Sequence, residues 1–419
     1  MKQFTILAHG SRGDVQPYVA FGFGLKQAGY SVKIAAPAQF QSLVLEYGLD
    51  FAPLAGDPRL LMAESVDQAS SQGNFLNSPR VILRYAAPIA LQVLRDAQHA
   101  CQGADGIIHS LLMTQVGHQI ALQSGVPDFS ALVFPVFSPT SNFPNPGFPD
   151  LRWALYNCLT HHLFSRLFSQ GGRLAYNWII RRRHSEFPPL AEWPFNGSRE
   201  RSTPILYGFS LHVIPKPADW SKDAHVTGFW FLANPAHWQP SAALVDFLAA
   251  GPPPVFVGFG SVISRRAHQL TEMVLEALAR TGQRGLLVSG WGGLTRMDLP
   301  REMFMLESAP FDWLFPQVRA AVIHGGIGTT AASMRAGIPT IVVPFTADQF
   351  FWGDRVSHLG VGPRPVPYRK LNVATLAEAI RHSLEDEGMQ QRARALGQVL
   401  RAEDGVSNAI RIVEKYLEV

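Results

Sequence analysis

The 419-residue chain contains only two cysteines, Cys101 and Cys158, and each stands in an apolar stretch. Two cysteines are too few for a disulfide framework, so we expect a reducing, cytoplasmic setting. The first residues, KQFTILAH, carry one lysine and no small-residue cleavage site, so we expect no signal peptide. No apolar run reaches the roughly 18 residues that a membrane-spanning helix needs, so we expect none.

An excess of one charge is also missing. Lysine and arginine (36) nearly balance aspartate and glutamate (32), which gives a net charge of +4. This small excess argues against a nucleic-acid partner. Glycine (36) and proline (31) are frequent but show no collagen-like period, and no internal repeat is visible. Apolar residues make up 47% of the chain, which is enough for two cores of about 200 residues each.

Apolar strands and amphipathic helices alternate through the first half. FTILAH, VQPYVAFGFGLKQAGY and SVKIAAP predict a strand, a helix that ends near Gly29, and a second strand. GADGIIHS and VPDFSALVF predict further buried strands, with a helix over Met113 to Gln123 between them. A proline- and aromatic-rich segment follows, and then a helical stretch from Leu151 to Arg183. This order predicts a parallel sheet with helices on both faces.

Prolines interrupt the pattern around residues 204–240, and the alternation restarts at PPVFVGFGS. Helices are expected from His268 to Thr281 and from Gly405 to Leu417. We therefore predict an α/β protein with two Rossmann-like doubly wound domains that face each other across a ligand-binding cleft. The expected divisions are an acceptor-binding domain (1–215), a linker (216–240), a nucleotide-binding domain (241–400) and a C-terminal segment (401–419) that packs toward the first domain.

The stretch HGGIGTT, His324 to Thr330, lies between an expected strand and an expected helix. Glycines let the backbone approach an anion closely, and the helix N-terminus offers free N–H groups. Thr329 and Thr330 add hydroxyl donors, and His324 stands where it could reach a phosphate oxygen. These features predict a pyrophosphate site, although a glycine-rich turn without a ligand would have the same pattern.

A second interpretation of the same turn is a nicotinamide-cofactor site. Gly326, Gly328 and Ala331 satisfy the G-x-G-x-x-A fingerprint, and Asp348 follows about 20 residues later. The turn lies in the second half of the chain, however, and Gln349 directly follows the acid. An adjacent acid and amide suit a polyhydroxylated ring, because they offer several donors and acceptors together.

Several weaker features could contact the same ligand. VGFGS offers Ser261 after another strand. Trp291, Phe311 and Trp313 are candidates to stack on a base, although ordinary core packing explains each of them equally well.

Near the N-terminus, HGSRGDVQPY places Asp14 where a helix begins. An acid in a glycine-bearing loop would repel phosphate, so the loop either binds something else or uses the acid chemically. Aspartate is also a common helix N-cap, and the loop alone does not separate a cap from a catalytic base.

Taken together, GSRGDVQPY and the stretch from APFDWLF to VSHLGVGP resemble the sterol and antibiotic glucosyltransferases. The resemblance covers most of the chain and also includes TGFWFL near the expected linker. It implies the GT-B architecture of inverting, metal-independent UDP-sugar enzymes, and it is nearest to the catalytic core of sterol 3-β-glucosyltransferases. The chain departs from the usual family pattern at His9, Phe311, Ile323 and Ile327.

The resemblance assigns roles to individual residues. Asp14 would be the general base, and three residues would lie beside the donor: Ser11, Arg12 and Gly13. The diphosphate would bind His324 and the amides and hydroxyls of Gly325, Gly326, Gly328, Thr329 and Thr330.

The remaining donor contacts are implied in the same way. Asp348 and Gln349 would hold the sugar hydroxyls. Ala309 would contact uracil through its backbone, with Phe311, Trp313, Ser261 and Trp291 nearby. No cofactor or metal is expected, and UDP-glucose would be the co-substrate.

The implied reaction moves a hexose, glucose from UDP-glucose, to a hydroxyl of a sterol or similar apolar acceptor. The aromatic segment would line the acceptor pocket with Phe134, Phe137, Phe143, Trp153 and Tyr156. Two alternatives stay open: a polyketide or antibiotic aglycone as acceptor, and a nicotinamide-dependent oxidoreductase that uses the GIGTTA turn.

An apolar acceptor resides in bilayers, so we also expect transient contact with an anionic membrane surface and a peripheral location. The expected docking face combines apolar residues with a following basic cluster: Trp153, Phe164, Leu167, Phe168 and Trp178, then Arg181, Arg182 and Arg183. The alternative is that the RRRH cluster is only a solvated helix end.

Overall fold

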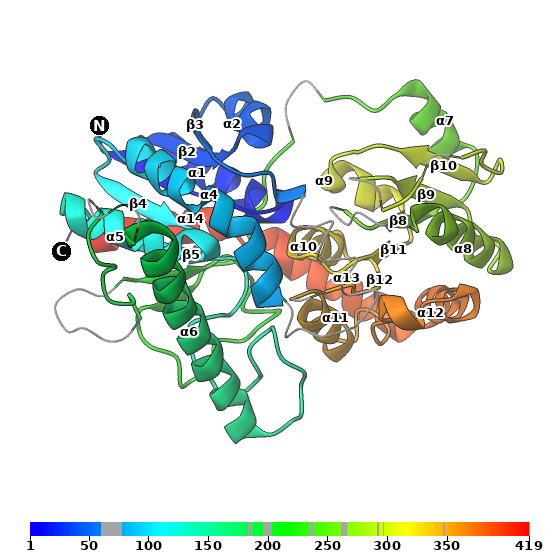
Figure 1. Ribbon diagram of the computed structural model, residues 1–419. Coiled ribbons are helices and arrows are strands. Elements are labelled where there is room, and N and C mark those ends of the chain that lie inside the picture. The colour runs from blue at the N-terminus through cyan, green and yellow to red at the C-terminus, as the bar shows by residue number, and fades with distance from the viewer. Residues whose placement is uncertain are drawn as a thin grey trace. The chain divides into compact units, whose positions relative to one another are not determined.

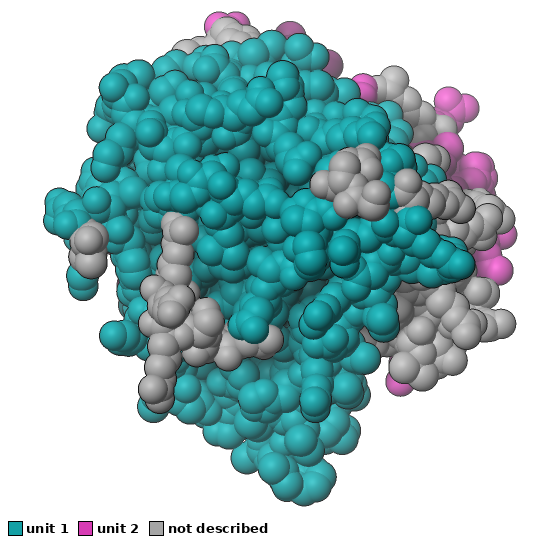
Figure 2. Space-filling model, turned by 60° about the vertical axis from the view of Figure 1, so that its left-hand side comes forward, with its two compact units in different colours: residues 1–61, 79–232, 404–419 teal, residues 62–78, 233–403 magenta. Residues whose placement is uncertain are grey.

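The computed structural model describes residues 1–59, 78–182, 184, 187–195, 203–234, 238–260, 266–290, 293–295, 297–346 and 348–418, without the side chains of 78–86. The chain divides into two compact units (Figures 1 and 2). The first unit contains residues 1–61, 79–232 and 404–419, and the second contains residues 62–78 and 233–403.

The first unit is built on a seven-stranded parallel sheet with the order β3-β2-β1-β4-β5-β6-β7. Its strands are β1 (Gln3–Leu7), β2 (Ser31–Pro37), β3 (Asp50–Leu54), β4 (Gly106–His109), β5 (Asp128–Leu132), β6 (Ile205–Tyr207) and β7 (Ala224–Val226). The central strands β1, β4 and β5 are buried almost throughout because helices cover both faces of a parallel sheet. The strand order reverses between β1 and β4, so loops that leave these two strands diverge there and open a crevice.

The helices of the first unit are α1 (Gln16–Gln27), α2 (Gln41–Glu46), α4 (Ser78–Ala100), α5 (Thr114–Ser124), α6 (Ala154–Tyr176) and α14 (Gly405–Leu417). A π-helical turn, Asn177–Arg181, extends α6. One end of α6 reaches beyond the sheet of its own unit (Figure 1).

The second unit has a five-stranded parallel sheet with the order β10-β9-β8-β11-β12. Its strands are β8 (Val255–Gly258), β9 (Gly285–Val288), β10 (Met303–Leu306), β11 (Ala320–Ile323) and β12 (Thr340–Val342). Its helices are α7 (Ala242–Ala249), α8 (Ala267–Arg280), α9 (Phe311–Leu314), α10 (Ile327–Ala336), α11 (Asp348–His358), α12 (Val373–Glu385) and α13 (Glu387–Ala402). Here the order reverses between β8 and β11.

The chain returns to the first unit through α14, which packs against α1. Asn408 Nδ2 donates to the carbonyl of Thr227 at 2.8 Å. Gly405 lies so close to the backbone at Gly228 that a side chain would not fit between them. These contacts fix the beginning of α14 on the segment that follows β7.

The prediction of two doubly wound α/β domains is confirmed by the two parallel sheets. Predicted helices at 113–123, 268–281 and 405–417 match α5, α8 and α14 within one residue at each end. The interval 216–240, which the sequence assigns to a linker, instead contributes β7 to the first sheet, and the first unit continues to Leu232. Within the described residues, no helix is both long and apolar enough to cross a membrane.

Candidate functional site

The residues predicted to bind the donor lie after the carboxyl ends of the strands of the second sheet. The loop after β10 carries Ala309, the turn after β11 carries His324, and the segment after β12 leads to Asp348. Because all five strands are parallel, these loops leave the sheet at one edge. This is the edge where ligands bind in open α/β sheets.

Two predicted donor contacts cannot be placed. Ser261 and Trp291 follow β8 and β9, and both lie outside the described residues. Their strands nevertheless end at the same edge of the sheet as the other loops.

His324 is buried directly after β11. A Cβ at Gly260, which has φ +58°, would stand 2.6 Å from His324 Cε1, and a Cβ at Gly326 would overlap Nε2. The imidazole therefore lies against the backbone of the β8 and β11 turns, which need glycine at both positions. Burial lowers the pKa of His324 to about 4, so the ring is neutral at pH 7. Nδ1 is buried and has no hydrogen-bond partner among the described residues.

Among the described residues, none bonds to the N–H groups of the first turn of α10. Gly326 is the N-cap and has no side chain, and the first intrahelical bond runs from the amide of Thr330 to the carbonyl of Gly326. The amides of Ile327, Gly328 and Thr329 precede that bond and point out of the helix end. Together with the neutral donor of His324, they form an arrangement that suits an anion.

The two threonines of this turn differ. Thr330 Oγ1 donates to the carbonyl of Gly326 at 2.9 Å and is fully buried, so its hydroxyl stabilises the turn. No hydrogen bond to the hydroxyl of Thr329 is found within the described part of the chain. Of the two hydroxyls predicted to bind phosphate, that of Thr329 is uncommitted.

The acid–amide pair lies at the beginning of α11. Gln349 Oε1 accepts from the amides of Phe345 (2.8 Å) and Thr346 (3.1 Å), so it holds the loop after β12. Its Nε2 donor is not used by any described residue. Asp348 is partly exposed. The predicted sugar contact of Gln349 therefore depends on its amide nitrogen alone.

The segment after β10 contains the residues predicted to contact the base. Ala309 is partly exposed in the loop. Phe311 stacks on Phe315 with a centroid distance of 4.7 Å and an interplanar angle of 2°. Trp313 contacts Trp238 at 5.2 Å. The ring of Phe311 is thus engaged in packing within the second unit.

In the first unit, Asp14 ends the 3-10 turn Arg12–Asp14, which lies between β1 and α1, next to the point where the strand order reverses. Asp14 Oδ2 accepts from the amide of Ser11 (2.8 Å) and from its hydroxyl (2.9 Å). The described residues supply no hydrogen bond to Oδ1. One oxygen therefore holds the loop, as expected of a cap, and the other stays available for chemistry.

The position of Asp14 requires glycine at position 10. Gly10 has φ +139°, and a Cβ there would stand 2.5 Å from Asp14 Oδ2. Burial raises the pKa of the Asp14 carboxyl, and the two hydrogen bonds from Ser11 lower it by less. The loop therefore holds a carboxylate whose pKa lies above its ordinary value.

The neighbours of Asp14 differ in their hydrogen bonds and exposure. Arg12 Nε donates to Gln16 Oε1 at 2.8 Å, and its side chain is exposed. Gly13 has open space around it apart from Ser11 Oγ. His9, at the end of β1, contacts the carbonyl of Ala55 at 3.0 Å, and burial lowers its pKa.

The structure contains a buried polar cluster that sequence reasoning missed. Asp128 Oδ2 contacts His109 Nε2 (3.0 Å) and His118 Nδ1 (2.9 Å) and accepts from Thr203 Oγ1 (3.2 Å). Burial raises the pKa of Asp128, but the two histidines lower it further, so the net shift is downward. Three of these residues lie within 19 positions of one another but on three different elements, β4, α5 and β5, and no local motif marks them. The cluster fixes the end of β4 next to Ser110, whose hydroxyl lies 3.4 Å from the amide of His9.

The residues predicted to line an acceptor pocket fall into two groups. Phe137 is buried and packs against four aromatic rings within 6 Å: Phe164, Phe168, Trp193 and Phe195. Phe143 contacts His161 and Trp220, and Phe134 is partly buried beside this loop. Trp153 is 58% exposed at the beginning of α6, and Tyr156 is partly exposed one turn later. The structure joins Phe137 to an aromatic cluster but does not place Trp153 in it.

The inner side of α6 holds the loop that contains these aromatics. Asn157 Nδ2 donates to the carbonyl of Ser141 (2.9 Å), and Thr160 Oγ1 accepts from the amide of Asn145 (2.9 Å). His161 Nε2 contacts the carbonyl of Phe143 at 3.1 Å. The loop after β5 is therefore fixed to one side of α6.

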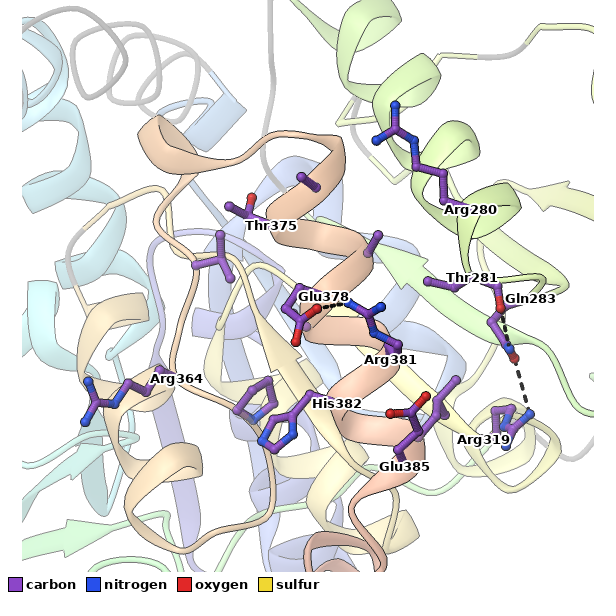
Figure 3. Close-up of a pocket in the computed structure, with 16 residues that line it drawn as sticks. Arg280, Thr281, Gln283, Arg319, Arg364, Thr375, Glu378, Arg381, His382 and Glu385 are labelled. Atoms are coloured by element: carbon purple, nitrogen blue, oxygen red, sulfur yellow. Dashed lines mark hydrogen bonds and ion pairs between the residues drawn. The ribbon is translucent and has the colours of Figure 1, made fainter.

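An open hollow of about 1160 Å³ lies elsewhere in the second unit, between α8 and α12 (Figure 3). Gln283 and Arg319 line it, and these residues precede β9 and β11, so the hollow is at the amino edge of the sheet. Its charged groups pair locally, Arg381 with Glu378, and Arg319 Nη1 donates to Gln283 Oε1. It is thus separate from the loops that carry the predicted donor contacts.

Comparison with known families gives two matches. Residues 4–111 match the glycosyltransferase family 28 N-terminal domain. Residues 293–411 match the erythromycin biosynthesis protein CIII-like, C-terminal domain. The first match contains the Asp14 loop, and the second contains the His324 turn.

Curated relatives match almost the whole chain. A sterol 3-beta-glucosyltransferase of Emericella nidulans is 37% identical over 99% of this chain, and the match covers 30% of that protein. The sterol 3-beta-glucosyltransferase UGT80B1 of Arabidopsis thaliana is 35% identical over 99% of this chain and 68% of its own length. The chain thus spans about a third of the fungal relative and about two thirds of the plant one.

Solved structures of similar fold include the glycotransferase of kitacinnamycin, with a TM-score of 0.71 and 18% identity over 99% of this chain and 98% of that one. The Streptomyces sp. SF2575 glycosyltransferase SsfS6, solved with thymidine diphosphate, has a TM-score of 0.64 and 17% identity over 99% of this chain and 100% of that one. At such identities the likeness establishes the shared fold alone.

Proposed function

The chain belongs to the sterol 3-beta-glucosyltransferase family and has the GT-B fold, and we propose that it transfers glucose from UDP-glucose to a hydroxyl of a sterol or sterol-like lipid. The proposed reaction inverts the anomeric carbon and needs no metal, as the family resemblance implies. The names of the relatives support the acceptor class and the sugar.

The observation that carries this proposal is the state of the Asp14 carboxylate. Its Oδ2 is held by Ser11, its Oδ1 has no described partner, and burial raises its pKa. A base that removes a proton from an alcohol works best when its pKa lies close to the working pH. The upward shift moves Asp14 in that direction, while the two hydrogen bonds fix its orientation.

In the proposed step, Asp14 accepts the proton of the acceptor hydroxyl. The acceptor oxygen forms a bond to the anomeric carbon as the bond from that carbon to the UDP oxygen breaks. The electron pair of the broken bond leaves on the β-phosphate of UDP. Attack from the side opposite the leaving group inverts the anomeric centre.

The departing diphosphate gains negative charge in this step. We assign its stabilisation to the first amides of α10 and to the donor of His324, which are uncommitted in the second unit. Fixed donors in a buried site stabilise developing charge because they need no reorganisation as the reaction proceeds. A neutral imidazole contributes as a donor, since burial keeps the His324 pKa near 4.

The nicotinamide alternative loses support from topology. A dinucleotide fingerprint belongs to the turn after the first strand of its domain. In the second sheet the GIGTTA turn follows β11, while the first strand is β8, on the other side of the point where the order reverses. The family matches also favour a glycosyltransferase.

The direct test is a transfer assay with radiolabelled UDP-glucose and a detergent-dispersed sterol. We expect a labelled product whose mass exceeds that of the sterol by one anhydrohexose. Calorimetric titration with UDP and with NAD serves as the companion measurement, and only UDP should bind. Transfer to polycyclic polyketides with none to sterols would replace the acceptor class, and binding of NAD without UDP would overturn the proposal.

A further inference from the structure

Helix α6 exposes a row of large apolar side chains to solvent. Leu155, Leu159, Leu163 and Leu167 follow one another at intervals of four residues, and Leu174 and Trp178 continue the same side. These six side chains are 48–70% exposed. Residues four apart share one side of a helix, so the row forms an apolar strip, interrupted at Gln170 and Gly171, which we call the leucine face. Exposed apolar strips of this kind mark interaction surfaces.

The opposite side of α6 packs inside the first unit between Asn157 and Phe168. Phe164 and Phe168 pack on Phe137, and His161 holds the loop after β5. This corrects the sequence-based docking face, in which Phe164 and Phe168 were expected to point outward. It also shows that the leucine face is not a core surface, since the core side of the helix is occupied.

The charged residues in the segment that carries the leucine face are all basic. Residues 151–182 contain five arginines and no aspartate or glutamate: Arg152, Arg166, Arg173, Arg181 and Arg182. Within the described part of the chain, none of these guanidinium groups forms an ion pair. Arg183, also expected here, lies outside the described residues. The chain as a whole carries nearly equal numbers of basic and acidic residues, so this segment is an exception.

We propose that the leucine face of α6 docks onto the surface of an anionic phospholipid bilayer, with the helix lying in the plane of the interface. A helix of 23 residues presents an apolar strip of roughly 35 Å. Leucines and Trp178 enter the boundary between headgroups and acyl chains while the unpaired arginines meet anionic headgroups. A second copy of the chain fits this face less well, because pairing two such faces would bring like charges together.

The biological role of this docking rests on the proposed function. A sterol-like acceptor resides in bilayers, and the inner side of the same helix holds the loop predicted to line the acceptor pocket. Docking through α6 therefore places that loop near the source of the acceptor. The docking itself does not depend on catalysis, so the two proposals can fail separately.

The test is co-sedimentation of the full chain with vesicles of phosphatidylcholine, with and without phosphatidylglycerol. The apolar variant combines Leu159→Gln, Leu163→Gln and Leu167→Gln, and its matched control changes three leucines that are 41–51% exposed elsewhere in the first unit: Leu45, Leu122 and Leu211. The charge variant combines Arg166→Gln, Arg173→Gln and Arg182→Gln. Its control makes the same change at three exposed arginines of the second unit: Arg301, Arg364 and Arg394.

We expect wild type and both controls to bind anionic vesicles at low salt and to detach as salt rises. The apolar variant should lose binding by about tenfold or more. The charge variant should lose the preference for anionic vesicles, since each arginine near the surface contributes about fivefold. Thermal melting checks that all variants fold, and transfer to detergent-dispersed sterol should be unchanged in all of them.

Equal binding of wild type and the apolar variant would overturn the proposal. So would equal binding of wild type to neutral and anionic vesicles. Light scattering after size exclusion adds a third check: a dimer in wild type that the apolar variant dissociates would assign the leucine face to a second copy instead. If docking holds but no sterol is glucosylated, the proposed function fails while the docking surface stands.

Discussion

The turn after β1 and the turn after β11 are built alike, but the first contains a carboxylate and the second contains a neutral histidine and amides without a side-chain cap. Each follows a buried strand at the carboxyl edge of a parallel sheet, next to the point where strand order reverses, and each leads into a helical turn through glycine. In the first, the carboxylate of Asp14 bonds to the amide of Ser11. In the second, the amides at the beginning of α10 have no side-chain partner.

The difference between the two turns indicates which of them can bind an anion. In the Asp14 loop, the amide of Ser11 already donates to the Asp14 carboxylate. A phosphate at that amide would therefore meet a like charge. The His324 turn offers amides and a neutral imidazole, whose Nδ1 has no hydrogen-bond partner among the described residues. We therefore propose that the same local architecture serves proton removal in the first unit and diphosphate binding in the second.

The sharpest way to break this comparison is Asp14→Asn. Asparagine keeps the size of the side chain and an oxygen to accept from Ser11, but it cannot take a proton. We expect transfer to fall by about 100-fold or more, with the thermal midpoint unchanged. Initial rates at saturating donor and acceptor measure this effect. Activity near the wild-type level would assign the base to another group, with His9 and His109 as the next candidates.

A second change tests the geometry of the same loop. Gly10→Ala places a methyl group 2.5 Å from Asp14 Oδ2 at φ +139°, whereas Gly29→Ala, at φ +93°, meets nothing within 4 Å. Displacement of the base should lower the turnover rate by about tenfold or more in the first variant. The second is the matched control and should stay close to wild type. Equal losses would mean that backbone strain at a positive φ, and not the placement of Asp14, controls the rate.

On the other side of the comparison, His324→Ala removes a buried donor from the diphosphate turn. The KM for UDP-glucose and the inhibition constant for UDP should both rise by about tenfold, because one charge-assisted hydrogen bond is lost. His268→Ala is the control, since that histidine is exposed on α8 of the same unit. Product-inhibition kinetics provide both constants. An unchanged UDP constant would remove His324 from the phosphate site.

The sugar contact can be isolated with Gln349→Glu. Glutamate keeps the oxygen that accepts from Phe345 and Thr346 but loses the amide donor. We expect a roughly fivefold loss in kcat/KM with UDP inhibition nearly unchanged. Gln349→Ala should add a stability loss of about 1 kcal/mol, seen in urea unfolding, because the loop loses its acceptor. Weakened UDP inhibition in Gln349→Glu would mean that this residue contacts the nucleotide.

The smallest expected effect concerns pH. Burial raises the pKa of Asp14, and the Ser11 hydroxyl lowers it by favouring the ionised form. A general base works only when deprotonated, so activity should fall as pH falls through its pKa. Ser11→Ala removes the hydroxyl donor and should move this acidic limb to higher pH. A limb that stays in place or moves down would show that another group controls it.

The sequence predicted the fold well because the residues that end helices and form strands can be recognised locally. Glycine and proline end most helices near the predicted positions, and apolar runs mark the strands that lie buried on both faces. The strand β7 was missed, because Ala224–Val226 is short and stands among prolines. A three-residue edge strand is defined by its neighbour β6, which the local pattern does not encode.

The sequence predicted which residues gather at the candidate site. It did not predict which of their side chains form hydrogen bonds within their own turns. Thr330 and Gln349 have suitable chemistry for a ligand, yet part of each is used to hold its own turn. Phe164 and Leu167 both read as apolar residues of one helix, but only the fold decides which points inward. The Asp128 cluster joins residues from separate elements, so no motif could reveal it.

The central claim is that one turn provides the base and the other binds the nucleotide. Calorimetric titration of UDP into Asp14→Asn and His324→Ala, side by side with wild type, tests it most directly. The account predicts that Asp14→Asn keeps the wild-type Kd within about twofold, while His324→Ala binds UDP about tenfold more weakly. Equal weakening in both variants, or full affinity in His324→Ala, would contradict the division of roles between the two turns.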